Sequence, residues 1–291
     1  MPRERILCVF SALGFAACAY QYTVFGLADK VRMPGAGWYE KSAAEVAKKF
    51  PLKNDPSEVM VGTAWVFTFL PNLLSTLYLL TAQRQRRIFP QVFYIVYCVN
   101  TLLTLAWTFT YERGLHLMST MIVGSVCVLG AIQLYIGIKH FKEFHISAPE
   151  KFKWWLQRVV LNSVALTTTW SFVALPSTVS YLLIYERSNQ SETAILKGLM
   201  NVDTATSIGL CLLAIGQITW TLLDFLIVPA YTSIVTSVYP VLVFGGFGLA
   251  LSNFEHGFNR HNIFCLVVGI VASISMIKRK RIHENSTPKQ E

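Results

Sequence analysis

Eight apolar stretches fill most of the 291-residue sequence, and they constrain the fold more than any motif does. A helix needs about 20 mostly apolar residues to cross the ~30 Å hydrocarbon core of a bilayer, and most of the eight reach that length. The last is short and would have to lie upright or thin the lipid locally. The sequence therefore predicts an all-α, polytopic transmembrane helical bundle with spans near residues 6–27, 59–81, 92–110, 115–138, 159–185, 205–228, 230–252 and 262–277.

Composition supports this prediction and leaves no room for a soluble domain. Hydrophobic residues make up 53% of the chain and charged residues 14%, whereas a soluble domain carries about 25% charged residues. The longest segment between spans, residues 28–58, is too short to bury a sizeable core. Residues 1–291 are thus predicted to form a single membrane domain that acts in or beside the bilayer.

The net charge of +9 arises from basic residues at the ends of the spans. Such clusters are typical of topology signals and of contacts with anionic head groups, so membrane lipids rather than nucleic acid are the expected partners. With eight spans, 15 lysines and arginines lie on the side that holds both termini, and 10 lie on the other. The excess predicts that both termini are cytosolic. The endoplasmic reticulum, the plasma membrane and other membranes are all compatible with this pattern.

Two further features bear on this topology. Asn189 begins an Asn-Gln-Ser sequon on the predicted lumenal side, which predicts a glycosylation site there. The first span follows a charged start, Arg3-Glu4-Arg5, and resembles a signal peptide, but its apolar run continues to Leu27. We favour a retained first helix; cleavage would leave seven spans and remove the cytosolic N-terminus.

Three connecting segments carry local predictions. Residues 40–50 are expected to form a short amphipathic helix on the membrane surface, with a solvated linker as the alternative. Trp154 and Trp155 are predicted to anchor an interfacial segment before the fifth span, because tryptophan gathers at that depth. Pro229 is predicted to form a very short turn between the sixth and seventh spans.

The sequence contains no recognisable set of catalytic residues. The six histidines lie at the ends of spans or in loops, and the six cysteines lie within predicted spans without the spacing of metal ligands. No nucleophile arrangement and no glycine-rich phosphate loop is evident. We therefore expect a protein that is not an enzyme and that holds no cofactor, metal or disulfide.

Polar and aromatic side chains within the spans are the candidate functional residues. An unpaired polar group in hydrocarbon costs several kcal/mol, so such groups face the interior of the bundle or a cavity. Helical spacing places them on one face of each of four helices. These faces hold Trp65 and Asn72 in the second span, Asn100 and Trp107 in the third, Trp170 in the fifth, and Trp220 and Asp224 in the sixth.

Two interpretations of these faces compete. One is that they join helices, because Asn, Ser and Thr commonly bond across membrane helices. The other is that they line a tryptophan-walled cavity for a flat, amphipathic ligand. Asp224 is the one carboxylate predicted within a span, which makes it a candidate functional group. Alternatively, it reaches the interface, since it lies about one turn from the predicted cytosolic end.

Three stretches resemble the translocator protein and tryptophan-rich sensory protein family (TspO and the peripheral benzodiazepine receptor), in particular its longer relatives with extra helices. They are residues 49–56 followed by Trp65, Asn72 and Tyr78; residues 100–107 with Asn100 and Trp107; and residues 161–185 around Trp170. The sequence departs from the family pattern because Pro51 and Pro56 are not adjacent, Thr104 replaces a second asparagine and Pro71 interrupts the tryptophan helix.

The resemblance implies a helical bundle with an internal pocket for a porphyrin, a sterol or a similar flat molecule, and it implies a homodimer. Trp65, Asn72, Asn100, Trp107 and Trp170 would then line or support the pocket. We expect a membrane protein that binds a lipophilic small molecule and senses or translocates it. The alternatives are a secondary transporter of a small solute that uses Asp224 and a structural membrane subunit.

Overall fold

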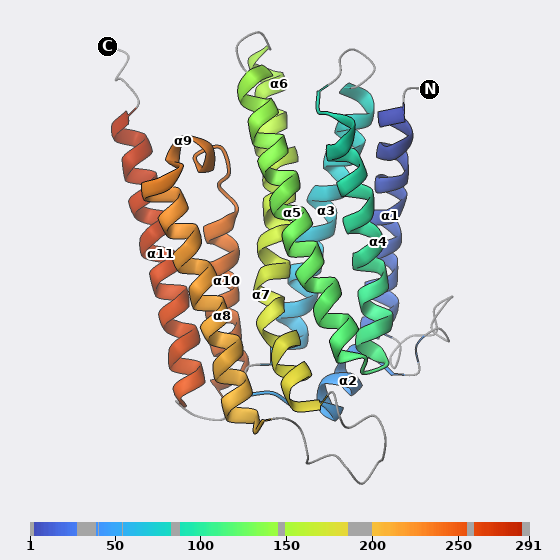
Figure 1. The fold of residues 1–291 in the computed structure, drawn as a ribbon, viewed down its shortest axis with the longest axis vertical. Helices are drawn as coiled ribbons and strands as arrows, with labels where there is room; N and C mark the ends of the chain where they lie inside the picture. The colour runs from blue at the N-terminus through green and yellow to red at the C-terminus, as the bar shows by residue number, and fades with distance from the viewer. Residues whose placement is uncertain are drawn as a thin grey trace.

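The computed structural model describes residues 3–27, 39, 41–53, 55–82, 88–144, 149–185, 200–254 and 259–286. These residues form a bundle of helices that lie side by side, and no strand occurs among them (Figure 1). Within them, seven helical stretches are long and apolar enough to cross a membrane. The prediction of an all-α, multi-pass membrane protein is therefore confirmed.

The long helices make up most of the bundle. α1 begins and α11 ends at the same end, which we call the upper end; the opposite end is the lower end (Figure 1). α10 (Val238–Ser252) also belongs to the bundle but has only 15 residues, fewer than any of the long helices. The long helices are α1 (Arg3–Leu27), α3 (Glu58–Ala82), α4 (Gln91–Glu112), α5 (His116–Phe144), α7 (Asn162–Tyr185), α8 (Val202–Leu222) and α11 (Arg260–Ser286).

The fifth predicted span, residues 159–185, is one part of a longer helical rod. α6 (Glu150–Trp155), a π-helical segment (Leu156–Leu161) and α7 follow one another without a break. Pro149 stands immediately before the first helical residue, where its missing N–H costs no helical hydrogen bond. Trp154 and Trp155 therefore belong to the same rod as the span and do not form a separate interfacial segment.

The connection between the sixth and seventh helices is longer than the predicted turn at Pro229. α8 continues into a π-helical segment (Leu223–Ile227), α9 (Pro229–Thr232) follows, and α10 begins only at Val238. Asn162 of α7 fixes this connection, because its Oδ1 accepts hydrogen bonds from the backbone N–H groups of Thr236 (2.7 Å) and Ser237 (2.9 Å). Conversely, α11 extends beyond the predicted span 262–277 at both ends.

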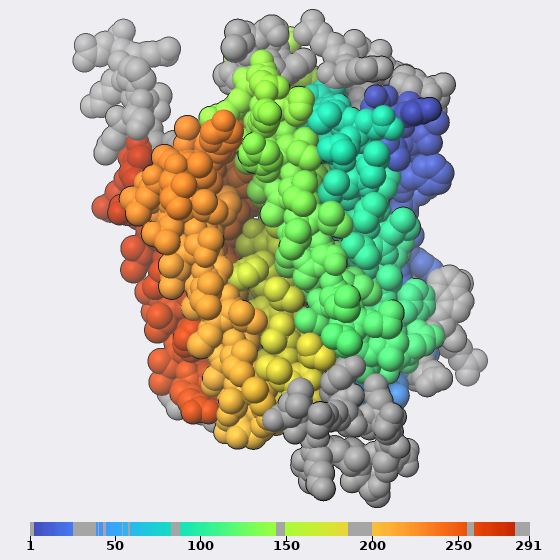
Figure 2. All heavy atoms as spheres, viewed as in Figure 1, coloured from blue at the N-terminus to red at the C-terminus, as the bar shows by residue number. Residues whose placement is uncertain are grey.

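α7 lies between two groups of helices. α1, α3, α4 and α5 form the α1–α5 group, and α8, α10 and α11 form the α8–α11 group; both contact α7 (Figure 1). In the space-filling view, green α5 and orange α8 flank yellow α7 (Figure 2). The α8–α11 group is close-packed: a Cβ atom on Gly246 of α10 would lie 2.6 Å from the backbone N of Gly269 of α11, so glycine is required for this approach.

A short helix, α2 (Ala43–Lys49), lies against the lower end of the bundle (Figure 1). Ser42 and Glu45 form a capping box at its start, which satisfies backbone N–H groups of the first turn. Phe50, at its end, is buried against the rings of His116 (4.7 Å) and Tyr185 (5.1 Å). A helix within residues 40–50 was predicted; the observed helix contacts α1 and α4, and Phe50 just after it contacts α5 and α7.

Candidate functional site

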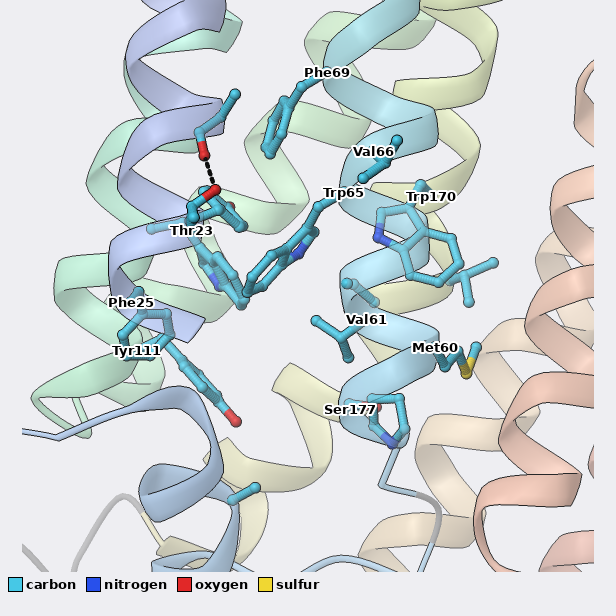
Figure 3. Close-up of a pocket in the computed structure, with 18 of the residues that line it drawn as sticks. Thr23, Phe25, Met60, Val61, Trp65, Val66, Phe69, Tyr111, Trp170 and Ser177 are labelled. Atoms are coloured by element: carbon cyan, nitrogen blue, oxygen red, sulfur yellow. Dashed lines mark hydrogen bonds between the residues drawn. The ribbon is translucent and has the colours of Figure 1, made fainter. Parts of the chain in front are cut away.

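A cavity of about 610 Å³ lies in the lower part of the α1–α5 group and reaches α7 and α10 (Figure 3). Its lining is mainly apolar. Pockets for small organic ligands typically measure about 300–1,000 Å³ and have apolar walls with a few polar groups. Along α3 the lining extends from Met60 to Leu73, which at about 1.5 Å per residue corresponds to ~20 Å of helix. The cavity is therefore long as well as large.

Aromatic rings form much of the cavity wall. Tyr22 of α1 lies between two indoles: its ring centroid is 4.4 Å from that of Trp65, in edge-to-face contact, and 5.8 Å from that of Trp107, in stacked contact. Tyr111 stacks on Trp107 at 5.1 Å and continues the wall toward the lower end. Trp65 extends from α3 toward α1 in Figure 3, and Trp170 lies farther from α1. Such rings offer flat apolar faces to a ligand.

The cavity opens sideways, between α1 and α3. Side chains on its rim include Thr23 of α1 and Val66 and Leu70 of α3, and all three are exposed on the outer surface of the bundle. Val66 is 60% exposed and Leu70 is 52% exposed. Apolar side chains exposed along a membrane-spanning helix face lipid. The mouth of the cavity therefore opens toward the hydrocarbon of the bilayer.

The lower end of the cavity is polar, and its central group is the carboxylate of Asp55. Asp55 precedes α3 and lines the cavity. The Tyr181 hydroxyl of α7 donates a hydrogen bond to Asp55 Oδ1 at 2.7 Å, and the Leu52 N–H donates to Asp55 Oδ2 at 2.8 Å. Tyr111 donates to the Tyr181 hydroxyl at 3.4 Å, which links the carboxylate to the aromatic wall.

Burial sets the protonation behaviour of Asp55. Desolvation raises the pKa of the Asp55 carboxyl from 3.8 to about 6, although the hydrogen bonds from Leu52 and Tyr181 act in the opposite direction. None of the ion pairs among the described residues involves Asp55. At neutral pH the cavity therefore carries a carboxylate that neutral donors hold in place and that has no cationic partner among the residues that the structure describes.

Three of the predicted site residues meet at this cavity. Trp65, Trp107 and Trp170 come from α3, α4 and α7, and all three line it. The indole Nε1 of Trp107 is buried without a hydrogen-bond partner among the described residues. This donor is therefore available to a ligand.

Asn72 and Asn100 lie above the cavity, and Asn72 joins helices. The Asn72 side chain donates to Thr167 Oγ1 of α7 at 2.6 Å and accepts from the Tyr97 hydroxyl of α4 at 2.7 Å. Asn72 and Asn100 line a void of about 10 Å³, which is enough for about one water molecule. The structure thus places both asparagines outside the large cavity, in a position where Asn72 connects α3 to α4 and α7.

Trp220 and Asp224 lie in the α8–α11 group, away from the cavity. Asp224 Oδ2 is 3.7 Å from Arg279 Nε, and both side chains are buried. Arg279 also donates to the backbone carbonyl of Thr232, so this ion pair connects α8, α9 and α11 near the upper end. The predicted convergence of four tryptophan-bearing faces is therefore wrong, because the Trp220 face does not reach the cavity.

Sequence reasoning missed Tyr22, Asp55 and Tyr181. Tyr22 and Tyr181 were ordinary aromatic residues within apolar runs. Asp55 was one of many charged residues in the segment 28–58, and its position beside Pro56 at the start of α3 was the available signal.

The sequon residue Asn189 lies outside the described residues. Among the residues that the structure describes, no three His, Cys, Asp or Glu side chains form a group that could hold a metal.

The fold and the cavity define a class: a multi-pass helical membrane protein with a laterally open, aromatic-walled pocket. No protein-family model, curated protein or solved structure matches this chain. The resemblance to the translocator protein family therefore stays a prediction that rests on the residues quoted for it.

Proposed function

We propose that this membrane protein binds a flat lipophilic ligand, porphyrin-like or sterol-like, in the cavity walled by Trp65, Trp107 and Trp170. The observation that carries the proposal is a cavity of about 610 Å³ that has tryptophan walls and a mouth exposed to lipid. The resemblance of the segments around these tryptophans to the translocator protein family points to the same class of ligand.

The position of the mouth indicates the route of the ligand. Val66 and Leu70 are exposed on the outer face of α3 and also line the cavity, so a lipophilic molecule can enter from the bilayer without crossing water. Inside, ring faces about 4–6 Å apart already contact one another, and a flat ligand would add stacked contacts with them. We propose sensing or translocation of such a ligand as the outcome of binding.

Transport of a small solute through Asp224 is less well supported. A coupling carboxylate in a transporter lies beside a solute site near the middle of the membrane. Asp224 instead pairs with Arg279 near the upper end, and it lines neither the large cavity nor the small void beside Asn72.

The test is a binding titration of the purified protein in detergent with a sterol and with protoporphyrin, read by quenching of tryptophan fluorescence. We expect saturable quenching by at least one of them, and we expect Trp107→Ala to weaken the affinity about tenfold, since a lost aromatic contact costs about 1 kcal/mol or slightly more. Trp220→Ala is the matched control, because Trp220 is also an intramembrane tryptophan but lies outside the cavity. Saturable binding that is equally weakened by both variants, or no saturable binding at all, would refute the proposal.

A further inference from the structure

The Asp55 carboxylate is the most unusual group in the cavity. It lies at the lower end of a mainly apolar space, and it is held there by Tyr181 and by the backbone of Leu52. Its backbone carbonyl is also fixed, because Asn253 of α10 donates to it at 3.0 Å. Hydrogen bonds from Leu52, Tyr181 and Asn253 thus hold both the side chain and the backbone of Asp55.

The two hydrogen bonds leave acceptor capacity on the carboxylate. Two ionised oxygens have about four lone-pair sites, of which Tyr181 and Leu52 occupy two. Both partners are neutral, and no ion pair in the described part of the chain involves Asp55, so these residues do not compensate the negative charge. A buried charge without an opposite charge is costly, and a ligand that supplies the opposite charge removes this cost.

The surroundings of Asp55 also suit a cation. The rings of Tyr181 and Tyr111 are 5.8 Å apart and lie beside the carboxylate, and Trp107 follows along the wall. Aromatic faces attract cations within about 6 Å by about 0.5–2 kcal/mol. A charge-assisted hydrogen bond is also roughly twice as strong as a neutral one. A ligand that carries a carboxylate at this end would be repelled.

We propose that Asp55 binds a protonated amine of the ligand, so that the pocket selects cationic amphiphiles with a flat apolar body and an amine at one end. This inference rests on the proposed ligand-binding function and specifies the class of ligand. The body would lie along the ~20 Å of α3 between Met60 and Leu73, with its amine toward the lower end.

The experiment uses three sterols with the same ring system and a different group at carbon 3: an amine, a hydroxyl and a carboxylate-bearing ester. Each is titrated against the full-length protein in nanodiscs of neutral phosphatidylcholine, because anionic lipid would concentrate the amine at the membrane surface. The wild-type protein is expected to bind the amine at least tenfold more tightly than the hydroxyl, and the carboxylate most weakly.

Asp55→Asn keeps the size of the side chain and removes its charge. We expect it to abolish the preference for the amine and to leave the affinity for the hydroxysterol within about twofold. Asp203→Asn is the matched control, because Asp203 is an exposed acid in the first turn of α8 and lies outside the cavity. Tyr181→Phe, which removes one donor and keeps the carboxylate, is expected to retain the preference.

The outcomes separate the two proposals. Equal affinities of the wild-type protein for amine and hydroxyl, or a preference that persists in Asp55→Asn, would overturn the role of Asp55 and leave the ligand pocket in place. Saturable binding of none of the three sterols would instead count against the proposed function. The comparison of ligands in the wild-type protein decides the matter even if Asp55→Asn does not fold.

Discussion

Two acids of this protein, Asp55 and Asp224, differ in what faces them. Asp224 lies near the upper end, 3.7 Å from the guanidinium of Arg279. Asp55 lies at the lower end beside a large cavity, and its partners are the Tyr181 hydroxyl and the Leu52 N–H. The comparison teaches that an acid in or near the membrane is a candidate binding group when it lies beside a cavity and is not paired with a cation.

The helices around the two acids are packed differently as well. In the α8–α11 group, Gly246 allows α10 to touch the backbone of α11 at Gly269. In the α1–α5 group, large rings such as Trp65, Tyr22 and Trp107 stand between the helices. Small residues allow close helix packing in membranes, and Gly14 provides such a contact between α1 and α4 as well, whereas the cavity lies where rings of α1, α3 and α4 meet. The cavity is therefore what distinguishes the α1–α5 group as the part suited to binding.

The largest effect is expected from breaking the ion pair at the upper end. Arg279→Leu leaves Asp224 buried without its cation, and removal of one partner of a buried pair costs about 3–5 kcal/mol. We expect the free energy of unfolding in detergent to fall by that amount. Ligand affinity of the remaining folded protein should be unchanged, because neither residue lines the cavity.

The control is the double variant Asp224→Leu with Arg279→Leu. It removes both charges, and it should be less destabilised than Arg279→Leu alone, since a well-packed apolar pair often replaces a buried ion pair at little cost. If the double variant is as unstable as the sum of the two single variants, the two charges do not interact and the comparison of the two acids loses its basis.

A smaller effect is expected at the contact between α10 and α11. In Gly246→Ala the added Cβ meets backbone atoms that cannot move aside as a flexible side chain would, and overpacking of this kind costs about 1–3 kcal/mol. The variant should melt at a lower temperature and keep its ligand affinity. Gly124→Ala in α5 is the matched control, because nothing lies within 4 Å of the added atom; similar losses in both would mean that contact distance is not the cause.

The sequence was sufficient for the class of fold because hydrophobic length alone selects membrane helices. The sequence was less reliable at helix ends. A run of apolar residues from 230 to 252 does not reveal that Asn162, which is distant in sequence, accepts hydrogen bonds from the backbone of residues 236 and 237, so that α10 begins only after them. Arg279 illustrates the same limit. Its place in a basic run after Ile277 suggested a membrane flank, but it is buried within the bundle.

The candidate site was predicted only in part, because the sequence does not show which helices lie next to each other. Helical periodicity shows which residues share a face, such as Trp65 and Asn72, but it does not show which faces of different helices meet. Trp65, Trp107 and Trp170 converge, whereas the face of Trp220 lies in the other group. Asp55 could not be identified because its role depends on the approach of Tyr181 from α7, 126 positions away in sequence.

The last effect concerns pH and tests the Asp55 carboxylate on its own. Burial raises the pKa of Asp55 in the folded protein to about 6, from an ordinary value of 3.8. Between these values the folded state binds more protons than the unfolded state. The free energy of unfolding therefore falls as the pH rises from about 4 to about 6, and it does not fall further through this group above pH 6.

Asp55→Asn carries no charge at any pH. The melting temperatures of the ligand-free variant and wild type should therefore nearly coincide at pH 3, below both pKa values, and the variant should melt higher at pH 7.5. A difference of the opposite sign, with Asp55→Asn the less stable protein at pH 7.5, would mean that the carboxylate already has a compensating charge without ligand, and the contrast with Asp224 would disappear.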